Sequence, residues 1–184
     1  MSTSESSHQW VFGYGSLIWR PGFDYKDARI ASLDGYSRRF WQGSHDHRGV
    51  PERPGRVVTL TRTPGITCTG RAYLVDAATV SRTFADLDHR EKNGYERARE
   101  TLTFASGEVV SSLVYIATPE NFAYLGDAPL TEIAQQIATS IGPSGRNDDY
   151  LFALAEALRA INTHDEHVFT LEAEVRRIRA EQSP

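Results

Sequence analysis

The chain is poor in cysteine, because Cys68 is alone among 184 residues. A lone cysteine excludes an internal disulfide and a zinc site built from several cysteines, and it fits a reducing compartment. Basic residues are thinly spread as well, since no run of lysine or arginine exceeds two residues and the net charge is −4. Proteins that bind nucleic acid usually carry a basic stripe and a high pI, so the sequence predicts no nucleic-acid partner.

Long apolar runs are also absent. No uninterrupted apolar segment approaches the ~20 residues that a membrane-spanning helix needs, and residues 1–7 are polar, unlike the apolar centre of a signal peptide. We therefore expect a cytoplasmic protein that does not associate with a membrane. The chain also lacks the Gly-Lys-Ser/Thr ending of a phosphate-binding loop.

The length is sufficient for one domain with a buried core. We expect that domain over residues 9–180, with a disordered tail at residues 1–8 and a disordered end after Ala180. The first two-thirds predict short strands at residues 10–14, 29–33, 38–42, 56–61, 69–75, 97–104 and 109–116. A turn at Thr63-Pro64-Gly65 would join two of these strands, and residues 43–56 would form a long loop.

The last third predicts helices. One covers residues 131–141, a second begins with Asn147 as its N-cap, and a third carries Val168, Leu171, Val175 and Ile178 on one face. Periodicity alone therefore indicates an α+β protein.

A glycine-containing turn follows the first strand, with the sequence Phe12-Gly13-Tyr14-Gly15-Ser16-Leu17. Glycine tolerates positive φ and lets a ligand approach the main chain closely. Successive N–H groups in such a turn can hold a carboxylate or a phosphate, and Ser16 adds a hydroxyl. A simple turn between a strand and a loop would have the same spacing, so both interpretations stay open on spacing alone.

A helix over residues 77–92 carries a carboxylate on its apolar face. Val80, Phe84 and Leu87 share that face, and Glu91 follows about 40° from Leu87. Burial and the negative end of the helix would both raise the pKa of Glu91. Asp76 could cap the start of the helix, and Arg90 and Lys92 would project to other sides. Glu91 would then suit a general base, whereas a glutamate that reaches solvent or pairs with an arginine fits the same pattern.

Two further patterns in the sequence are weaker. The sequences His45-Asp46-His47 and His164-Asp165-Glu166-His167 could supply metal ligands, but zinc needs three or four ligands with supporting contacts. We expect no metal and no cofactor, with His47 bonded to backbone in a loop and the second pair at a solvated helix end. Residues 142–147 could bind phosphate at a helix N-terminus, or simply connect two helices.

Longer sequence motifs resemble one family. They are Val11-Phe12-Gly13-Tyr14-Gly15-Ser16-Leu17-Ile18-Trp19, Tyr36-Ser37-Arg38-Arg39-Phe40-Trp41-Gln42-Gly43-Ser44, Asp46-His47-Arg48-Gly49, Pro54-Gly55-Arg56-Val57-Val58-Thr59-Leu60, Arg90-Glu91-Lys92 with Gly94-Tyr95, and Ile141-Gly142-Pro143-Ser144-Gly145-Arg146-Asn147 with Tyr150-Leu151. Together they resemble the ChaC family of glutathione-specific γ-glutamylcyclotransferases over residues 10–171. His89 and Asn93 depart from the family pattern, where an aromatic residue and glycine are common.

The resemblance implies a small mixed β-barrel with surrounding helices and an internal acyl transfer. The α-amine of a γ-glutamyl group attacks its own γ-carbonyl, so that 5-oxoproline and a free amine form without water. With glutathione as the substrate, the released amine is Cys-Gly. No serine or cysteine nucleophile is needed, because the nucleophile belongs to the substrate.

Residue roles follow from the matching motifs. Glu91 is the expected general base and acid. The expected substrate-binding residues are Val11, Phe12, Gly13, Tyr14, Gly15, Ser16, Leu17, Arg48, Tyr115 and Tyr150. The three tyrosines are candidate donors to the developing oxyanion, and Arg38, Arg39, Arg48 and Arg56 are candidates to hold the Cys-Gly carboxylate.

Two alternatives stay open from the sequence. The protein could act on γ-glutamyl amino acids or amines instead of glutathione. It could also bind a γ-glutamyl metabolite as a regulator without turning it over. A binding protein has no need of an acid–base residue at position 91, which separates that alternative from the two enzymatic ones. The oligomeric state does not follow from the sequence.

Overall fold

The structure is a computed structural model and describes residues 7–182. The strands are β1 (Gln9–Gly13), β2 (Asp27–Ser44), β3 (Gly55–Val75), β4 (Glu96–Phe104), β5 (Val109–Ile116), β6 (Ile141–Gly142) and β7 (Gly145–Arg146). The helices are a short 3-10 turn, η1 (Ser16–Ile18), and the α-helices α1 (Val80–Arg90), α2 (Leu130–Thr139), α3 (Asn147–Ala160) and α4 (Glu166–Gln182).

Five strands close into a barrel in the order β1-β3-β2-β4-β5. The barrel is mixed, because β1 runs antiparallel to β3 and parallel to β5. Closure removes free edges within the barrel, whereas residues 33–44 of β2 and 55–68 of β3 pair mainly with each other. The expected fold class, a small mixed barrel with surrounding helices, is confirmed.

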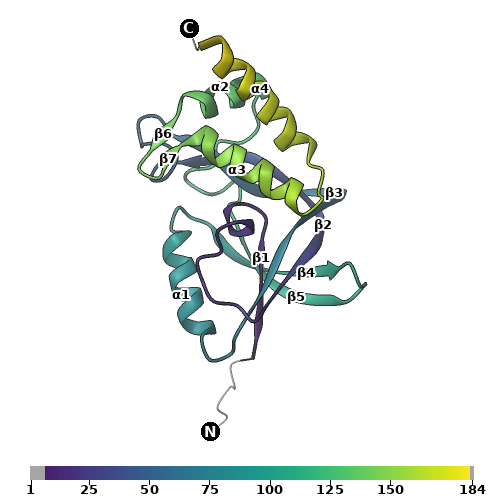
Figure 1. The fold of residues 1–184 in the computed structure, drawn as a ribbon. Helices are drawn as coiled ribbons and strands as arrows, with labels where there is room; N and C mark the ends of the chain where they lie inside the picture. The colour runs from purple at the N-terminus through teal and green to yellow at the C-terminus, as the bar shows by residue number, and fades with distance from the viewer. Residues whose placement is uncertain (1–6, 183–184) are drawn as a thin grey trace.

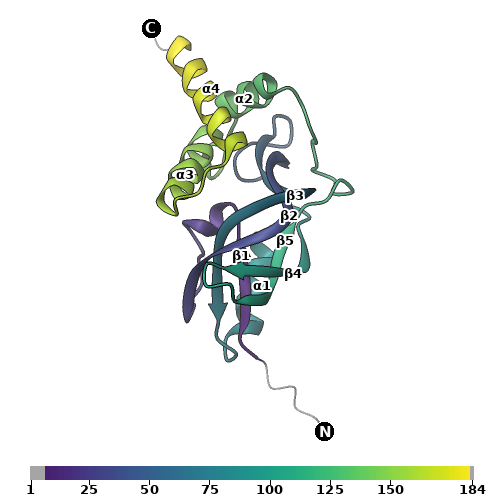
Figure 2. The ribbon, with the colours of Figure 1, turned by 90° about the vertical axis from the view of Figure 1, so that its right-hand side faces the viewer.

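Helices cover the barrel in two places (Figures 1 and 2). Helix α1 lies along its side, and a buried cluster that includes Val11, Phe84 and Leu87 joins the two. Helices α2, α3 and α4 gather at the end of the molecule opposite the start of β1, over the far ends of β2 and β3. A second, larger cluster connects these helices to the barrel interior.

The expected division of β2 and β3 into shorter strands is wrong. Each is one long strand, and the two pair antiparallel along most of their length. Residues 63–66 have no partner in this register and lie opposite a shift near Gly35, so Thr63-Pro64-Gly65 forms a bulge within β3. The chain does bend there, with Gly35 and Gly65 both at φ +81°, but both flanks of the bend pair with β2 and not with each other. The β4–β5 hairpin is as predicted.

The helix ends differ from the sequence pattern in three places. Helix α1 begins after Thr79, while Asp76 accepts a hydrogen bond from the Ala78 amide (2.8 Å) in the turn before it. Helix α2 ends at Thr139, because the residues that follow pair as β6 and β7. Asn147 does not cap α3 with its side chain; it bonds the amide and carbonyl of Arg56 at 2.7 and 2.8 Å.

Most residues of the two ends that were expected to be disordered are not described by the structure. Residues 1–6 and 183–184 lie outside the described residues. His8 accepts a hydrogen bond from the Ala77 amide at 2.9 Å, and α4 continues to Gln182, past the expected end at Ala180. Between residues 7 and 182, none of the helices is both long and apolar enough to span a membrane.

Candidate active site

The turn after β1 presents backbone donors. The amides of Gly15, Ser16 and Leu17 donate to no described residue, because the first amides of a helical turn have no partner inside it. Neither Gly13 nor Gly15 has positive φ. They are required by packing, since a Cβ would lie 2.7 Å from Leu17 at Gly13 and 2.8 Å from Val58 at Gly15. The turn can therefore hold a carboxylate on main-chain N–H groups.

Glu91 lies directly after the last residue of α1, where its amide donates to the Leu87 carbonyl at 2.8 Å. Its side chain is 19% exposed. Burial raises the pKa of Glu91, the Arg90 guanidinium opposes that rise, and the Asp46 carboxylate adds to it. The apolar face of α1 thus carries Glu91 inward, in agreement with the sequence pattern.

Arg90 contributes more than the sequence suggested. It does not project away from Glu91, because its Nε lies 3.8 Å from Glu91 Oε1. The same guanidinium donates to the carbonyls of Arg20 and Pro21 and to Ser16 Oγ, at 2.9 to 3.0 Å. Arg90 therefore fixes the end of α1 to the loop that follows the glycine turn.

Two adjoining cavities meet at Glu91. The larger, of about 240 Å³, is lined by Ser16, Trp19, Arg20, Ser44, Asp46, His47, Arg48, Val57, Arg90, Glu91, Asn93, Tyr95, Ser144 and Tyr150. The smaller, of about 50 Å³, is lined by Phe12, Tyr14, Gly15, Ser16, Leu17, Val58, Glu91, Tyr95, Tyr115 and Tyr150. Both are lined by Ser16, Glu91, Tyr95 and Tyr150, so we treat them together as the catalytic cavity. Among the expected binding residues, Val11 and Gly13 do not line it.

The three candidate tyrosines are not equivalent. Tyr14 donates its hydroxyl proton to the Tyr115 carbonyl at 2.5 Å, and Tyr115 donates to Asp88 at 2.7 Å. Tyr150 accepts a long hydrogen bond from the Val58 amide at 3.4 Å, and its own proton has no described acceptor. Burial raises the pKa of Tyr150 above its usual range, so its hydroxyl remains a donor. Tyr150 is the tyrosine best placed to donate to a ligand.

Tyr95 lines both parts of the cavity but was not among the expected site residues. Its hydroxyl donates to the Val58 carbonyl at 2.9 Å, and burial raises its pKa well above the ordinary value. The sequence did give one indication of this role, because Tyr95 stands close to Glu91 in the family-like motif that ends in Gly94-Tyr95.

The four candidate arginines differ in burial and in the cavity that they line. Arg38 and Arg56 are buried and bonded to protein groups, and Arg39 lines a different cavity. Arg48 lines the catalytic cavity, where its Nη1 donates to the Arg146 carbonyl at 3.1 Å and its guanidinium lies 5.9 Å from the centre of the Tyr150 ring. Burial lowers the pKa of Arg48. Arg20, which was not among the candidates, lines the same cavity.

The expected long loop, which joins β2 to β3, forms one wall of the catalytic cavity. His47 bonds the Ser144 hydroxyl at 3.0 Å, where a backbone partner was expected, and the Ser144 amide donates to the His47 carbonyl at 2.9 Å. These bonds join the loop to the β6–β7 turn. A Cβ on Gly142 would lie 2.3 Å from the same carbonyl, so the glycine-rich motif at residues 142–147 packs tightly on this wall.

The histidine pairs have different surroundings. Among residues 7–182, no group of three or more His, Cys, Asp or Glu side chains is arranged to hold a metal ion. His167 is not at a solvated helix end: its Nε2 accepts from the Phe40 amide at 3.0 Å, and burial, with Arg39 nearby, lowers its pKa to about 4.

Comparison with known proteins supports the resemblance. Residues 9–178 match the family model described as ChaC-like protein. The chain is 43% identical over 173 residues to glutathione-specific gamma-glutamylcyclotransferase 1 of Danio rerio, covering 91% of this chain and 88% of that protein. It is 44% identical over 182 residues to gamma-glutamylcyclotransferase 2-3 of Arabidopsis thaliana, covering 94% and 90%.

A solved structure has the same fold. The crystal structure of the γ-glutamyl cyclotransferase specific to glutathione from yeast superposes with a TM-score of 0.87 at 30% identity, covering 93% of this chain and 96% of that one. With a family model that matches nearly the whole chain and relatives above 40% identity, this chain belongs to the ChaC-like family.

Proposed function

We propose that this protein is a glutathione-specific γ-glutamylcyclotransferase that forms 5-oxoproline and Cys-Gly. One observation carries the proposal: a buried carboxyl with a raised pKa, Glu91, lines the same cavity as the turn after β1, whose amides donate to no described residue. The two relatives and the yeast structure are named for the same reaction class.

The glutamyl end of the substrate fits the smaller part of the cavity. Its α-carboxylate binds the amides of Gly15, Ser16 and Leu17, which are free to donate. Its α-ammonium then lies toward Glu91, which lines the same space. Holding the two ends of the glutamyl group also folds its side chain toward ring closure, and orientation of this kind can lower a barrier by several kcal/mol.

Glu91 transfers the proton that the reaction needs. Its carboxylate takes a proton from the α-ammonium, whose ordinary pKa is near 8. The freed amine attacks the γ-carbonyl carbon, so that a C–N bond forms and the carbonyl oxygen becomes an oxyanion. When the oxyanion collapses, the original amide C–N bond breaks and Glu91 returns the proton to the leaving nitrogen. The second proton of the attacking nitrogen passes to the released amine, so that a neutral lactam forms and Cys-Gly leaves with a protonated amino group. A carboxyl with a raised pKa suits both steps.

Tyr150 and Arg48 have separate roles in this proposal. The Tyr150 hydroxyl, which has no described acceptor, donates to the oxyanion. Arg48 lies at the larger part of the cavity, where the Cys-Gly carboxylate of glutathione would extend. A charged hydrogen bond there would favour glutathione over a γ-glutamyl amino acid that ends one residue earlier.

A product assay tests the proposal. Purified protein is incubated with reduced glutathione and, in parallel, with γ-glutamyl-alanine, and 5-oxoproline is measured by mass spectrometry. We expect 5-oxoproline with an equal amount of Cys-Gly from glutathione, and little from γ-glutamyl-alanine. Ring product from γ-glutamyl-alanine alone would keep the mechanism and replace the substrate. No ring product from either, with a folded protein, would leave the binding regulator as the surviving alternative.

We also place the enzyme in the cytoplasm. The support is compositional: the lone Cys68 is buried as a free thiol, which fits a reducing compartment. Cell fractionation with detection of the protein outside the cytosolic fraction would contradict this placement.

A further inference from the structure

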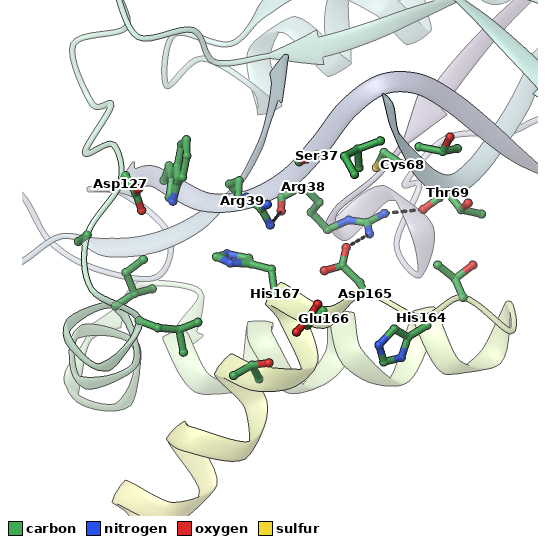
Figure 3. A pocket seen from close by; sticks show the side chains of 18 residues that line it. Ser37, Arg38, Arg39, Cys68, Thr69, Asp127, His164, Asp165, Glu166 and His167 are labelled. Atoms are coloured by element: carbon green, nitrogen blue, oxygen red, sulfur yellow. Dashed lines mark hydrogen bonds and ion pairs between the residues drawn. The ribbon is translucent and has the colours of Figure 1, made fainter. Parts of the chain in front are cut away.

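A second cavity lies between β2, β3 and the start of α4 (Figure 3). Its volume is about 770 Å³, within the range of small-molecule sites. It shares no lining residue with the catalytic cavity. The proposed reaction therefore makes no use of it, and its charged side chains need a separate explanation.

One ion pair in this cavity is already satisfied. Arg38 donates to Asp165 at 2.6 Å and to the Thr69 carbonyl at 2.5 Å (Figure 3). It also donates to the Tyr14 carbonyl at 2.6 Å. Asp165 also accepts from the Val168 amide at 3.1 Å, at the start of α4. These two side chains hold β2, β3 and α4 together, and they have little capacity left for a ligand.

Three other donors on β2 are not satisfied. Ser37, Arg39 and Trp41 lie close together on this strand and all line the cavity. Ser37 is 4% exposed, and neither its hydroxyl nor the buried Trp41 Nε1 has a hydrogen-bond partner among residues 7–182. Within the part of the chain that the structure describes, Arg39 makes only a long hydrogen bond, 3.4 Å, to the Arg38 carbonyl. Buried polar groups without partners are rare in native proteins, and a missing ligand is one of the few explanations.

His167 adds a neutral donor beside Arg39 (Figure 3). Its Nε2 accepts from the Phe40 amide, so the hydrogen bond assigns the ring proton to Nδ1. The lowered pKa of His167, about 4, keeps the ring neutral at physiological pH. The ring lines the cavity and offers an N–H group without a second positive charge.

Two carboxylates complete the lining. Asp127 and Glu166 form no ion pair or hydrogen bond with any residue between 7 and 182 that the structure describes. Once the Arg38–Asp165 pair is set aside, the cavity therefore contains one available guanidinium and two available carboxylates. Ile66, Leu130 and Ile133 line the same space and suit an apolar side chain.

We propose that this cavity binds a small zwitterion, an amino acid or a short peptide with an apolar side chain. Its carboxylate would bind Arg39 and the neighbouring N–H and O–H donors, and its ammonium would bind Asp127, while Glu166 lies on the other side of Arg39 and His167 (Figure 3). An anion without an ammonium group would face two unpaired carboxylates, and a cation without a carboxylate would face Arg39. Only a ligand with both charges satisfies both sets of groups.

The three tryptophans of the chain allow ligand binding to this cavity to be tested directly. Trp41 lines this cavity, Trp19 lines the catalytic cavity, and Trp10 packs on Phe104 with ring centres 5.0 Å apart. The three indole N–H signals of ¹⁵N-labelled protein therefore report on three places. The probes are L-leucine and glycyl-L-leucine, with 4-methylpentanoate and 3-methylbutylamine as matched compounds that lack the ammonium or the carboxylate.

We expect L-leucine or glycyl-L-leucine to move the Trp41 signal saturably below roughly 10 mM, while Trp10 and Trp19 stay in place. The more tightly bound of the two identifies the ligand as an amino acid or a peptide. Each single-charge compound should bind at least about tenfold more weakly, since each loses one charged hydrogen-bonded contact. No movement of Trp41, or equal binding of 4-methylpentanoate, would overturn the proposal.

Substitutions test the assigned contacts. Arg39→Gln and Asp127→Asn should each weaken binding at least about tenfold, with glutathione turnover unchanged because neither residue lines the catalytic cavity. Arg62→Gln, a change at an exposed β3 arginine, serves as the matched control with unchanged binding. The Trp10 signal shows whether each variant is folded. If one of the two variants unfolds, the binding measured for the folded variant tests the proposal. Unchanged binding in a folded variant would overturn the proposal.

Discussion

Glu91 and Glu172 are both largely buried glutamates, with side chains 19% and 7% exposed. Their surroundings nevertheless shift the carboxyl pKa in opposite directions. At the end of α1, burial dominates and raises the pKa of Glu91. Between α3 and α4, burial by itself would raise the pKa of Glu172, yet hydrogen bonds from Arg159 and Arg176 lower it.

The difference between the two sites is the geometry of the arginine partners. Arg159 and Arg176 both donate directly to the Glu172 carboxylate, the latter at 2.9 Å. The nearest guanidinium to Glu91 stays 3.8 Å away, because Arg90 gives its hydrogen bonds to the loop after the glycine turn. A buried carboxylate with satisfied partners stabilises a fold, whereas one without them is available for proton transfer.

The largest predicted effect is on turnover at the unpaired glutamate. Glu91→Gln should lower kcat for 5-oxoproline formation by about 10²- to 10⁴-fold, the usual contribution of a general acid–base group. Glu172→Gln is the matched control, and its kcat should stay within about threefold of wild type because Glu172 does not line the catalytic cavity. Near-normal turnover by a folded Glu91→Gln protein would contradict the assignment of Glu91 as the general base and acid.

The next effect concerns the tyrosine hydroxyls. Tyr150→Phe should lower kcat by about 10²- to 10³-fold, the cost of removing an oxyanion donor. Tyr115→Phe removes a hydroxyl that already donates to Asp88, so its kcat should change much less. Steady-state kinetics on both variants make the comparison, and equal losses would argue against a special role for Tyr150.

A smaller effect is expected at Arg48. Arg48→Gln should raise KM for glutathione by about 10- to 100-fold, the range for a lost hydrogen bond to a charged group. KM for γ-glutamyl-alanine should change little, because that substrate ends before the Cys-Gly carboxylate. Arg53→Gln is the control, since Arg53 is exposed in the same loop and lines neither part of the cavity. A parallel rise for both substrates would contradict the assigned contact.

The smallest effects are on stability, with opposite signs at the two glutamates. Glu172 has a lowered pKa, so its ionised form stabilises the folded protein above the ordinary value of 4.5, and this gain disappears as pH falls through the folded-state pKa. Glu172→Gln should therefore lower the free energy of unfolding by about 1 to 2 kcal/mol near neutral pH. The loss should shrink in acid.

The raised pKa of Glu91 predicts the reverse. Its ionisation costs stability as pH rises from 4.5 through the folded-state pKa, and glutamine avoids that cost. Glu91→Gln should be more stable than wild type near neutral pH, with no advantage in acid. Urea denaturation at about pH 4 and about pH 7 measures both variants. Destabilisation by Glu91→Gln near neutral pH would contradict the comparison.

Sequence periodicity predicted much of the fold, and its failures share one cause. The strands and helices followed from alternation and 3.6-residue spacing, but Gly65 was assigned to a hairpin turn and lies in a bulge. A turn and a bulge contain the same residues. Which one forms depends on the distant strand that pairs with the flanks, and that strand is β2 on both sides. Asn147 shows the same limit, because its partner is the distant Arg56.

The sequence could predict the place of a candidate site residue when that place depends on a single helix or strand. The position of Glu91 followed from its spacing to Leu87 on α1. The tyrosines could not be ranked, because the group that binds the Tyr115 hydroxyl, Asp88, comes from a different element. Arg90 was misjudged for the same reason: its partners Ser16 and Arg20 are about 70 residues away in the chain.

The most direct test of the account is a carboxyl-carbon NMR titration of Glu91 and Glu172 in the same protein sample. Both resonances are followed in one pH series, with Glu91→Gln and Glu172→Gln to assign them. We expect Glu91 to titrate above the ordinary glutamate value of 4.5 and Glu172 below it. If Glu91 titrates at or below 4.5, the carboxyl is not poised for proton transfer, and its assignment as general base and acid is contradicted.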